Sequence, residues 1–177
     1  MTAHPFSLSR APDGRTLRIT VKALGDHSAT FGELKAGTRV VAEGPFGVFT
    51  RDARRRMKAL LIAGGIGITP VRALAEQLDS NAVVLYRVVD ESDIVFRDEL
   101  EALAARRGFD LHYVIGDHAT ADGARLLTPA HLEELLPDIA ERDVFVCGPP
   151  AMTDLAVRHV RAAGVPRRFI HAERFAL

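Results

Sequence analysis

The sequence predicts an α/β fold, in which a five-stranded parallel sheet with helices on both faces follows a segment made mainly of short β-strands. Three observations support this prediction. After residue 58, short apolar segments alternate with segments of helical periodicity, as in parallel sheets with crossover helices. The first apolar segment, residues 59–63, is apolar throughout, which is typical of a strand buried on both faces. The first 50 residues instead show period-two alternation and turn residues.

The second half of the chain supplies the elements of the parallel sheet. The expected strands are residues 59–63, 83–86, 111–115, 144–146 and 168–171. The expected helices are residues 71–78, 94–106, 129–136 and 151–163. Thr128 followed by Pro129 is typical of a helix start, and Gly164 of a helix end.

The first half of the chain is expected to be extended. Residues 15–22 alternate with period two, residues 38–43 lie between glycines, and a third extended piece ends at Thr50. The pattern changes after Thr50, so we place a domain boundary between residues 50 and 58. The connecting residues 51–58 are basic, and they form either a solvated linker or an anchor for an acidic partner or anionic surface.

Composition excludes several classes of protein. The chain has 177 residues with 23 basic and 23 acidic side chains, so its zero net charge argues against nucleic-acid binding. One cysteine excludes a disulfide scaffold and a Cys-rich zinc site, and it fits a reducing compartment. The seven histidines match no zinc spacing, so no metal is expected. There is no apolar run long enough to cross a membrane and no signal peptide at the start.

The strongest local signal is a glycine-rich turn at residues 64–70, which read GGIGITP. It comes directly after a buried strand and directly before a helix. Glycine allows a sharp turn and close approach to a phosphate, and the helix start offers N–H groups to an anion. Pro70 suits the first position of the helix. A tight turn without a ligand is the alternative.

The end of the second parallel strand bears on the choice of nucleotide. Dinucleotide folds often carry an acid about 20 residues past the glycines, where it binds the ribose 2′-hydroxyl. Arg87 stands there instead, and a cation suits a 2′-phosphate, which favours NADPH over NADH. The alternative is a surface arginine paired with Asp90 or Glu91.

A second turn, residues 146–152 (VCGPPAM), follows the fourth parallel strand. Ligands bind at such strand ends, and Gly148 and Pro149 shape a rigid turn that leaves Cys147 near the cleft. Gly67 and Cys147 are expected on neighbouring strands. The alternative for Cys147 is a buried small hydrophobe.

Six motifs occur in one order along residues 4–175. They are HPFS at 4–7, GDHS at 25–28, GPFG at 44–47, GIGITP at 65–70, CGPP at 147–150 and ERF at 173–175. With them, the sequence resembles the ferredoxin–NADP reductase superfamily. It is similar in particular to the flavoprotein domains of ferric reductases and NADPH oxidases, truncated at the N-terminus.

The resemblance implies roles for individual residues. Phe6 would pack on the flavin ring, Ser7 would hydrogen-bond flavin N5, and Thr69 and Cys147 would flank the nicotinamide. Phe175 would cover the flavin until the nicotinamide displaces it. The alternative is that Phe6 and Phe175 are aromatic residues of the hydrophobic core and do not contact a flavin. The remaining residues assigned to the cofactors are His4, Pro5, Lys22, Gly25, Asp26, Ser28, Gly64, Gly65, Gly67, Pro70, Gly148, Pro149 and Glu173.

The implied activity is hydride transfer from NADPH, or NADH, to FAD, followed by single-electron transfer to an acceptor. Heme, ferric iron, an iron–sulfur protein and oxygen are the candidate acceptors, and a heme-bearing membrane domain is a candidate partner. The implied location is cytoplasmic, including the cytoplasmic face of a membrane. The resemblance also implies that residues 1–56 form a partial antiparallel β-barrel of the FAD-binding type and that residues 57–177 form the NAD(P)-binding domain. Members of the family place further barrel strands before the HPFS motif, so we expect an incomplete flavin site and weak FAD retention. An NAD(P)H-binding module without a competent flavin site is the alternative.

Overall fold

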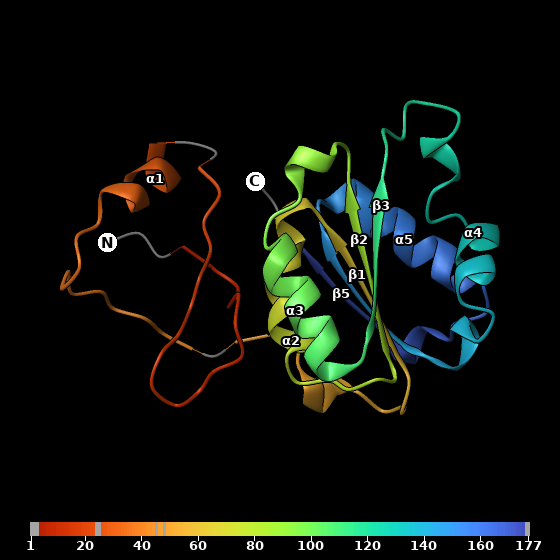
Figure 1. Ribbon diagram of the computed structural model, residues 1–177, viewed down its shortest axis with the longest axis horizontal. Helices are drawn as coiled ribbons and strands as arrows, with labels where there is room; N and C mark the ends of the chain where they lie inside the picture. The colour runs from red at the N-terminus through yellow and green to blue at the C-terminus, as the bar shows by residue number, and fades with distance from the viewer. Residues whose placement is uncertain (1–3, 24–25, 45, 48, 176–177) are drawn as a thin grey trace.

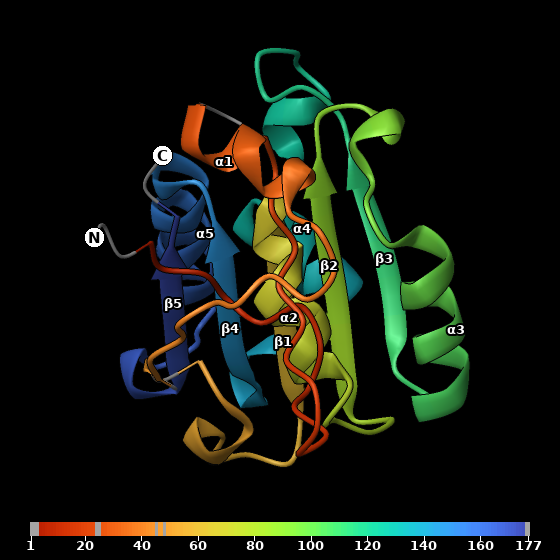
Figure 2. The same ribbon diagram turned by 90° about the vertical axis from the view of Figure 1, so that its left-hand side faces the viewer.

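The computed structural model describes residues 4–23, 26–44, 46–47 and 49–175. A parallel sheet with helices on both faces forms one body, and the described part of residues 4–56, here called the arm, lies along one side of it (Figure 1). Seen from that side, the arm runs in front of helix α2 and strand β1 (Figure 2). The arm contains one short helix, α1, at Asp26–Ala29.

The predicted five-stranded parallel sheet is confirmed. Its strands are β1 at Ala59–Gly64, β2 at Ala82–Val88, β3 at Asp110–Ile115, β4 at Asp143–Gly148 and β5 at Ile170–Arg174. Their order across the sheet is β3-β2-β1-β4-β5, and all four pairings are parallel. Strands β2 and β3 follow on one side of β1, and strands β4 and β5 follow on its other side, so the strand order reverses between β1 and β4. In open parallel sheets this is where ligands bind, beyond the carboxyl ends of the strands.

The helices cover both faces, as predicted. They are α2 at Ile68–Ala75, α3 at Arg97–Arg107, α4 at Pro129–Leu135 and α5 at Pro150–Ala162. Helices α2 and α3 lie on one face of the sheet, and α4 and α5 on the other (Figure 1). Helix α2 begins earlier than predicted, so Pro70 is its third residue and not its first. The missing N–H costs little there, because the first-turn N–H groups of a helix have no intrahelical partner.

Alternation along the buried strands divides the core into two layers. Leu61 of β1 packs on the α2 and α3 side with Tyr86 and Phe145, whereas Leu60 and Ile62 pack on the α4 and α5 side. All six residues of β1 are buried. The uniformly apolar sequence of β1 follows from its central position, with a strand on each side and helices above and below.

The arm differs from the predicted barrel. Strands expected over residues 15–22, over 38–43 and up to Thr50 are absent among the described residues of the arm, where antiparallel pairing is reduced to one bridge between Leu8 and Ile19. The apolar side chains of the expected strands lie in solvent, with Leu17 66% and Val41 88% exposed. A strand needs a neighbouring strand or a covering layer, and these segments have neither within the described chain.

The basic connector is held on the sheet by its own chain. The buried carboxylate of Asp143 accepts the backbone N–H groups of Arg55 and Arg56 at 2.7 and 2.5 Å, respectively. The guanidinium of Arg56 stacks on the Phe169 ring at 3.5 Å, and Lys58 pairs with Asp138 at 2.8 Å. These contacts attach the connector to the sheet through two backbone N–H groups, one ring contact and one ion pair, which favours a structural connector over an anchor.

Candidate nucleotide-binding site

Two glycine-containing loops meet at the carboxyl ends of β1 and β4. A Cβ atom added to Gly67 would lie 2.1 Å from the carbonyl oxygen of Cys147. A Cβ atom on Gly148 would lie 3.1 Å from the Cα of Gly64. The two backbones are therefore in direct contact, and side chains at these positions would force them apart. Cys147 lies on β4, which pairs with β1 as predicted, whereas Gly67 lies in a 3-10 turn at Gly65–Gly67 directly after β1 and not on the strand itself.

Gly65 forms the open side of this junction. Its φ is +49°, and an added Cβ would meet nothing within 4 Å, so the backbone there is accessible to a ligand. At Gly64 an added Cβ would meet the terminal methyl of Met152, the first-turn residue of α5 that covers this glycine. The arrangement combines a close backbone contact with one open glycine, as a phosphate cradle requires.

The start of α2 is organised around Thr69. Its hydroxyl donates to the carbonyl oxygen of Ile66 at 3.1 Å, and the residue is 3% exposed. The N–H of Ile68 is already bonded to the carbonyl of Gly65. The Thr69 oxygen retains its acceptor lone pairs, so it can receive a hydrogen bond from a ligand amide.

The thiol of Cys147 is fully buried and does not open to the cleft. Burial raises the pKa of this thiol to about 12, with a smaller contribution from the negative charge of Glu173. Cys147 therefore stays neutral at physiological pH. The burial of Cys147 is therefore that of a small hydrophobic core residue, which was the alternative interpretation of this cysteine.

The end of β5 closes the site beside Cys147. Glu173 is the register partner of Cys147, and burial raises the pKa of its carboxyl group. The N–H of Phe175 donates to the carbonyl oxygen of Gly148 at 3.1 Å, and its ring packs on the core layer that contains Cys147. An added Cβ on Gly47, in the arm, would lie 3.2 Å from a Glu173 carboxylate oxygen. The GPFG turn therefore reaches the same locus.

Arg87 lies at the carboxyl end of β2. Its guanidinium donates to the carbonyl oxygens of Val88 and Val114, the latter at 3.1 Å. Burial lowers the pKa of Arg87, and the nearby charge of Asp117 opposes that shift. The alternative pairing with Asp90 or Glu91 is wrong, because Asp90 caps its own turn and Glu91 pairs with Arg97.

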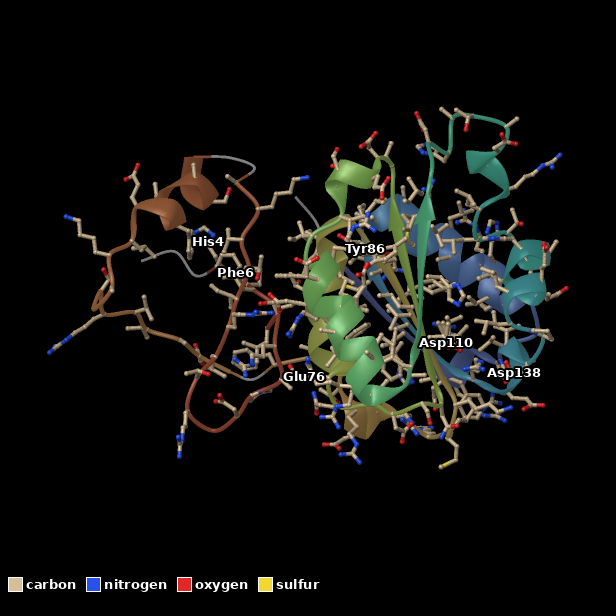
Figure 3. The ribbon with its side chains drawn as sticks, viewed as in Figure 1. His4, Phe6, Glu76, Tyr86, Asp110 and Asp138 are labelled. Carbon is tan, nitrogen blue, oxygen red and sulfur yellow. The ribbon has the colours of Figure 1, made fainter. Side chains whose placement is uncertain are left out.

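The predicted flavin contacts lie in the arm, away from the sheet. His4 and Phe6 are on the arm side of α2 (Figure 3). The Phe6 ring is 41% exposed and packs edge-on against Phe31 of the arm at 5.1 Å. Pro5 and Lys22 are exposed, and Ser7 is half-buried. The structure does not bring these residues into contact with Cys147 or Phe175 among the contacts of the described chain.

The expected pyrophosphate turn is described in part. Gly25 lies outside the described residues. Asp26 begins α1, and Ser28 is half-buried within that helix. The first N–H groups of a short helix have no partner within the helix, so a phosphate role for this turn stays a prediction.

Sequence reasoning missed a polar cluster that attaches the arm to the sheet. Arg72 of α2 is 5% exposed and bonds the carbonyl oxygen of Ser9 at 2.9 Å. Arg18 and Glu99 complete the cluster. The available signal was an arginine at position 72 within the apolar stretch of α2, where a charged side chain needs a partner.

Comparisons with known proteins agree with the geometry. Residues 61–158 match the family described as the oxidoreductase NAD-binding domain. The chain is 35% identical to "Ferredoxin--NADP reductase B" of Sorangium cellulosum, over 96% of this chain and 77% of that protein. It is also 35% identical to the ferredoxin reductase component of 3-ketosteroid-9-alpha-monooxygenase of Mycolicibacterium smegmatis, over 98% of this chain and 50% of that protein.

A solved structure supports the same relationship. The flavohem-like FAD/NAD-binding domain of nitric oxide dioxygenase from Vibrio cholerae superimposes with a TM-score of 0.69 at 26% identity, over 96% of this chain and 76% of that domain. The chain thus spans from half to about three quarters of these proteins. No helix within the described residues is long and apolar enough to cross a membrane. Among the same residues, no group of three His, Cys, Asp or Glu side chains could hold a metal ion.

Proposed function

Because this chain belongs to the ferredoxin–NADP reductase superfamily, we propose that it is the nucleotide- and flavin-binding part of an NAD(P)H-dependent flavin reductase. Residues 57–177 form the NAD(P)-binding domain in this proposal, and residues 1–56 contribute to the flavin side. The observation that carries it is the contact between the Gly67 and Cys147 loops at the switch point of the sheet.

The chain's own residues hold the nucleotide at this junction. The open backbone at Gly65 and the start of α2 receive the pyrophosphate. Pro70 presents no N–H and sets the direction of the first turn. Arg87, fixed by two carbonyl groups, presents its remaining N–H groups to a 2′-phosphate. This favours NADPH, with NADH as a weaker substrate.

Orientation is the main contribution of the protein to the reaction. NAD(P)H supplies a hydride, which FAD accepts and passes on as single electrons. Thr69 holds the nicotinamide amide, and the backbone turn of Cys147 and Gly148, with the neutral thiol buried beneath it, forms the wall behind the ring. Phe175 excludes water from the same place until the nicotinamide arrives. Gly148 and Pro149 keep the wall rigid.

The arm residues fit a flavin in chemistry. Phe6 offers a half-exposed aromatic face and Ser7 a hydroxyl two residues before the buried Ser9. Lys22 supplies an exposed cation for a phosphate, and Ser28 a hydroxyl at α1. His4, Pro5 and Asp26 belong to the same two motifs, and Glu173 lies at the nicotinamide end.

The acceptor in this proposal is a ferredoxin or an oxygenase component. The relatives are named as a ferredoxin–NADP reductase and as the reductase component of a monooxygenase, which supports this class over a membrane heme domain. The likeness to ferric reductases and NADPH oxidases stays a prediction.

Anaerobic mixing with FAD and NADPH tests the proposal. We expect bleaching of the flavin absorbance together with loss of the nicotinamide band, and faster bleaching with NADPH than with NADH. Bound NADPH that stays unoxidised in the presence of bound FAD would refute the reductase.

One observation favours a second candidate, an NAD(P)H-binding module that lacks a flavin site of its own. The arm has a single β-bridge among its described residues and exposes Val40 and Val41. In this case NADPH binds with ordinary affinity and FAD does not bind, which equilibrium dialysis of both cofactors separates from the first candidate.

A further inference from the structure

A polar cluster joins the arm to helices α2 and α3; Ser9 and Arg72 in it are buried, whereas the side chains of Arg18 and Glu99 are 33% and 41% exposed. The Nη1 of Arg72 donates to the carbonyl oxygen of Ser9 at 2.9 Å, and its Nη2 pairs with Glu99 at 2.8 Å. Ser9 is fully buried, whereas Leu8 before it is half-buried and Arg10 after it is exposed. The side chain that reaches it comes from a residue 63 positions away in the sequence.

A second arginine completes the cluster from within the arm. The Nη2 of Arg18 donates to the carbonyl oxygen of Ser9 at 2.9 Å, so this one oxygen accepts from two guanidinium groups. Arg18 also forms a two-pronged contact with the Glu99 carboxylate at 3.2 and 3.0 Å. We call Ser9, Arg18, Arg72 and Glu99 the arm latch.

The latch also shapes the arm locally. The N–H of Ser9 donates to the carbonyl of Arg18 at 2.7 Å, next to the Leu8–Ile19 bridge. The Arg18 guanidinium lies over the ring of Phe96 at 5.2 Å. Phe96 adopts a left-handed backbone with φ of 62°, an uncommon conformation for a bulky residue that places its ring there. The four residues thus hold two arm segments and two helices in one arrangement.

The arm latch lies close in sequence to a predicted flavin contact on one side and to a predicted nicotinamide contact on the other. Ser9 follows the predicted flavin contact Ser7 by two residues, about 7 Å of extended chain. Arg72 follows the predicted nicotinamide contact Thr69 by three residues, about one helical turn on the same face. The Arg72–Ser9 hydrogen bond is therefore a short connection between the two groups whose spacing governs hydride transfer.

We propose that the arm latch, and Arg72 in particular, positions the flavin-contacting segment relative to the nicotinamide-binding loop. The inference rests on the proposed reductase function. If the cluster served only to attach the arm, we would expect each of its buried polar atoms to have a hydrogen-bond partner. The buried Nε of Arg72 has no such partner among the described residues. Arg72 therefore lacks one possible hydrogen bond, while its Nη1 and Nη2 atoms hold Ser9 and Glu99 in a fixed arrangement, as expected of a positioning residue.

Three readouts on four variants and the wild type test this role. Arg72→Met removes the charge and the guanidinium but keeps an unbranched side chain, Arg72→Lys keeps the charge, and Glu99→Gln weakens both arginine contacts. Arg97→Met is the matched control, because Arg97 lies on α3 with Glu99 but pairs with Glu91 and stacks on Tyr113. Hydrogen exchange of residues 7–20 reports the attachment of the arm. Stopped-flow flavin reduction at saturating NADPH reports positioning, with NADP⁺ affinity measured separately.

In Arg72→Met we expect flavin reduction to slow by about 10-fold or more, because a displacement of about 1 Å can cost about 100-fold. NADP⁺ affinity should stay within about twofold, since the nucleotide loop keeps its own contacts. Exchange in residues 7–20 should accelerate, Arg72→Lys should recover part of both effects, and the Arg97→Met control should match the wild type.

Three results would overturn the positioning role. They are an unslowed reduction in Arg72→Met, slow reduction with unchanged exchange of the arm, and an equal loss of NADP⁺ affinity and rate. If Arg72→Met loses the circular dichroism of the sheet, the milder Glu99→Gln decides by the same readouts. A wild type that binds FAD and NADPH without reducing the flavin overturns the proposed function as well, so the two failures are distinguishable.

Discussion

Replacement of Gly67 by alanine gives a sharp test of the nucleotide site. The added methyl carbon would lie 2.1 Å from the Cys147 carbonyl oxygen, whereas an ordinary contact begins near 3.4 Å. The two loops must therefore separate by about 1.3 Å, the difference between those values. The obstacle is backbone in a buried strand, so no rotamer change can relieve it.

Both stability and binding should fall. Overpacking of this kind costs about 2 kcal/mol, which corresponds to a decrease in Tm of roughly 4–8 °C for a chain of this size. The loop that cradles the pyrophosphate moves with Gly67, so we expect NADP⁺ affinity to fall by at least about tenfold, or about 1.4 kcal/mol. Differential scanning fluorimetry and a calorimetric NADP⁺ titration measure the two effects.

Two neighbouring glycines supply matched controls. Gly65→Ala meets no atom within 4 Å, so its positive φ alone costs about 1 kcal/mol of stability. Gly64→Ala meets chiefly the flexible end of Met152, which can move aside, and the ring of Pro149 at 3.3 Å. Both controls serve for stability, and a Gly67→Ala variant that binds NADP⁺ as tightly as the wild type would refute the argument from backbone contact.

Three further predictions concern residues around the same edge of the sheet. Arg87→Ala should weaken NADPH binding by about tenfold and leave NADH binding nearly unchanged, since only the 2′-phosphate contact is lost; an equal loss for both nucleotides in a fluorescence titration would contradict this. Burial raises the pKa of Cys147 from 9.0 to about 12, so the stability that its neutral thiol contributes is complete below about pH 9 and declines as pH rises toward 12. Urea unfolding should therefore show a smaller alkaline loss in Cys147→Ala than in the wild type, and an identical loss would argue against a buried thiol. Removal of Phe175 and the two residues after it should increase the relative use of NADH, measured as the ratio of kcat/KM values, because the ring no longer competes with the nicotinamide; an unchanged ratio would leave Phe175 with a packing role.

The sheet could be predicted because each of its signals is local. Residues 59–63 are apolar throughout, the glycines follow at once, and the Thr128–Pro129 pair caps α4 through a hydrogen bond from the His131 N–H. Parallel pairing then follows from the alternation of strands and helices. Errors were limited to helix and strand ends, such as the early start of α2 at Ile68.

The arm could not be predicted in the same way, because strands depend on partners that the local sequence does not specify. Val40 and Val41 have the composition of a strand, yet they are 74% and 88% exposed without a neighbouring strand. The latch was missed for a related reason. Arg72 is separated by 63 positions from Ser9, and no spacing pattern connects them.

Binding and transfer therefore depend on different parts of the molecule. The proposed nucleotide site lies at backbone contacts between the ends of β1 and β4, at the centre of the sheet, and those contacts include no residue of the arm. The flavin side depends on tethers, which are the arm latch on α2, the Asp143 contacts at the start of β4, and the approach of Gly47 to Glu173. A substitution at the backbone contacts between β1 and β4 should abolish NADPH binding and therefore every later step. A substitution in the tethers should leave NADPH bound and slow only the passage of the hydride, because it changes the distance between two intact sites. The Gly67 and Arg72 variants consequently separate the two contributions within one chain.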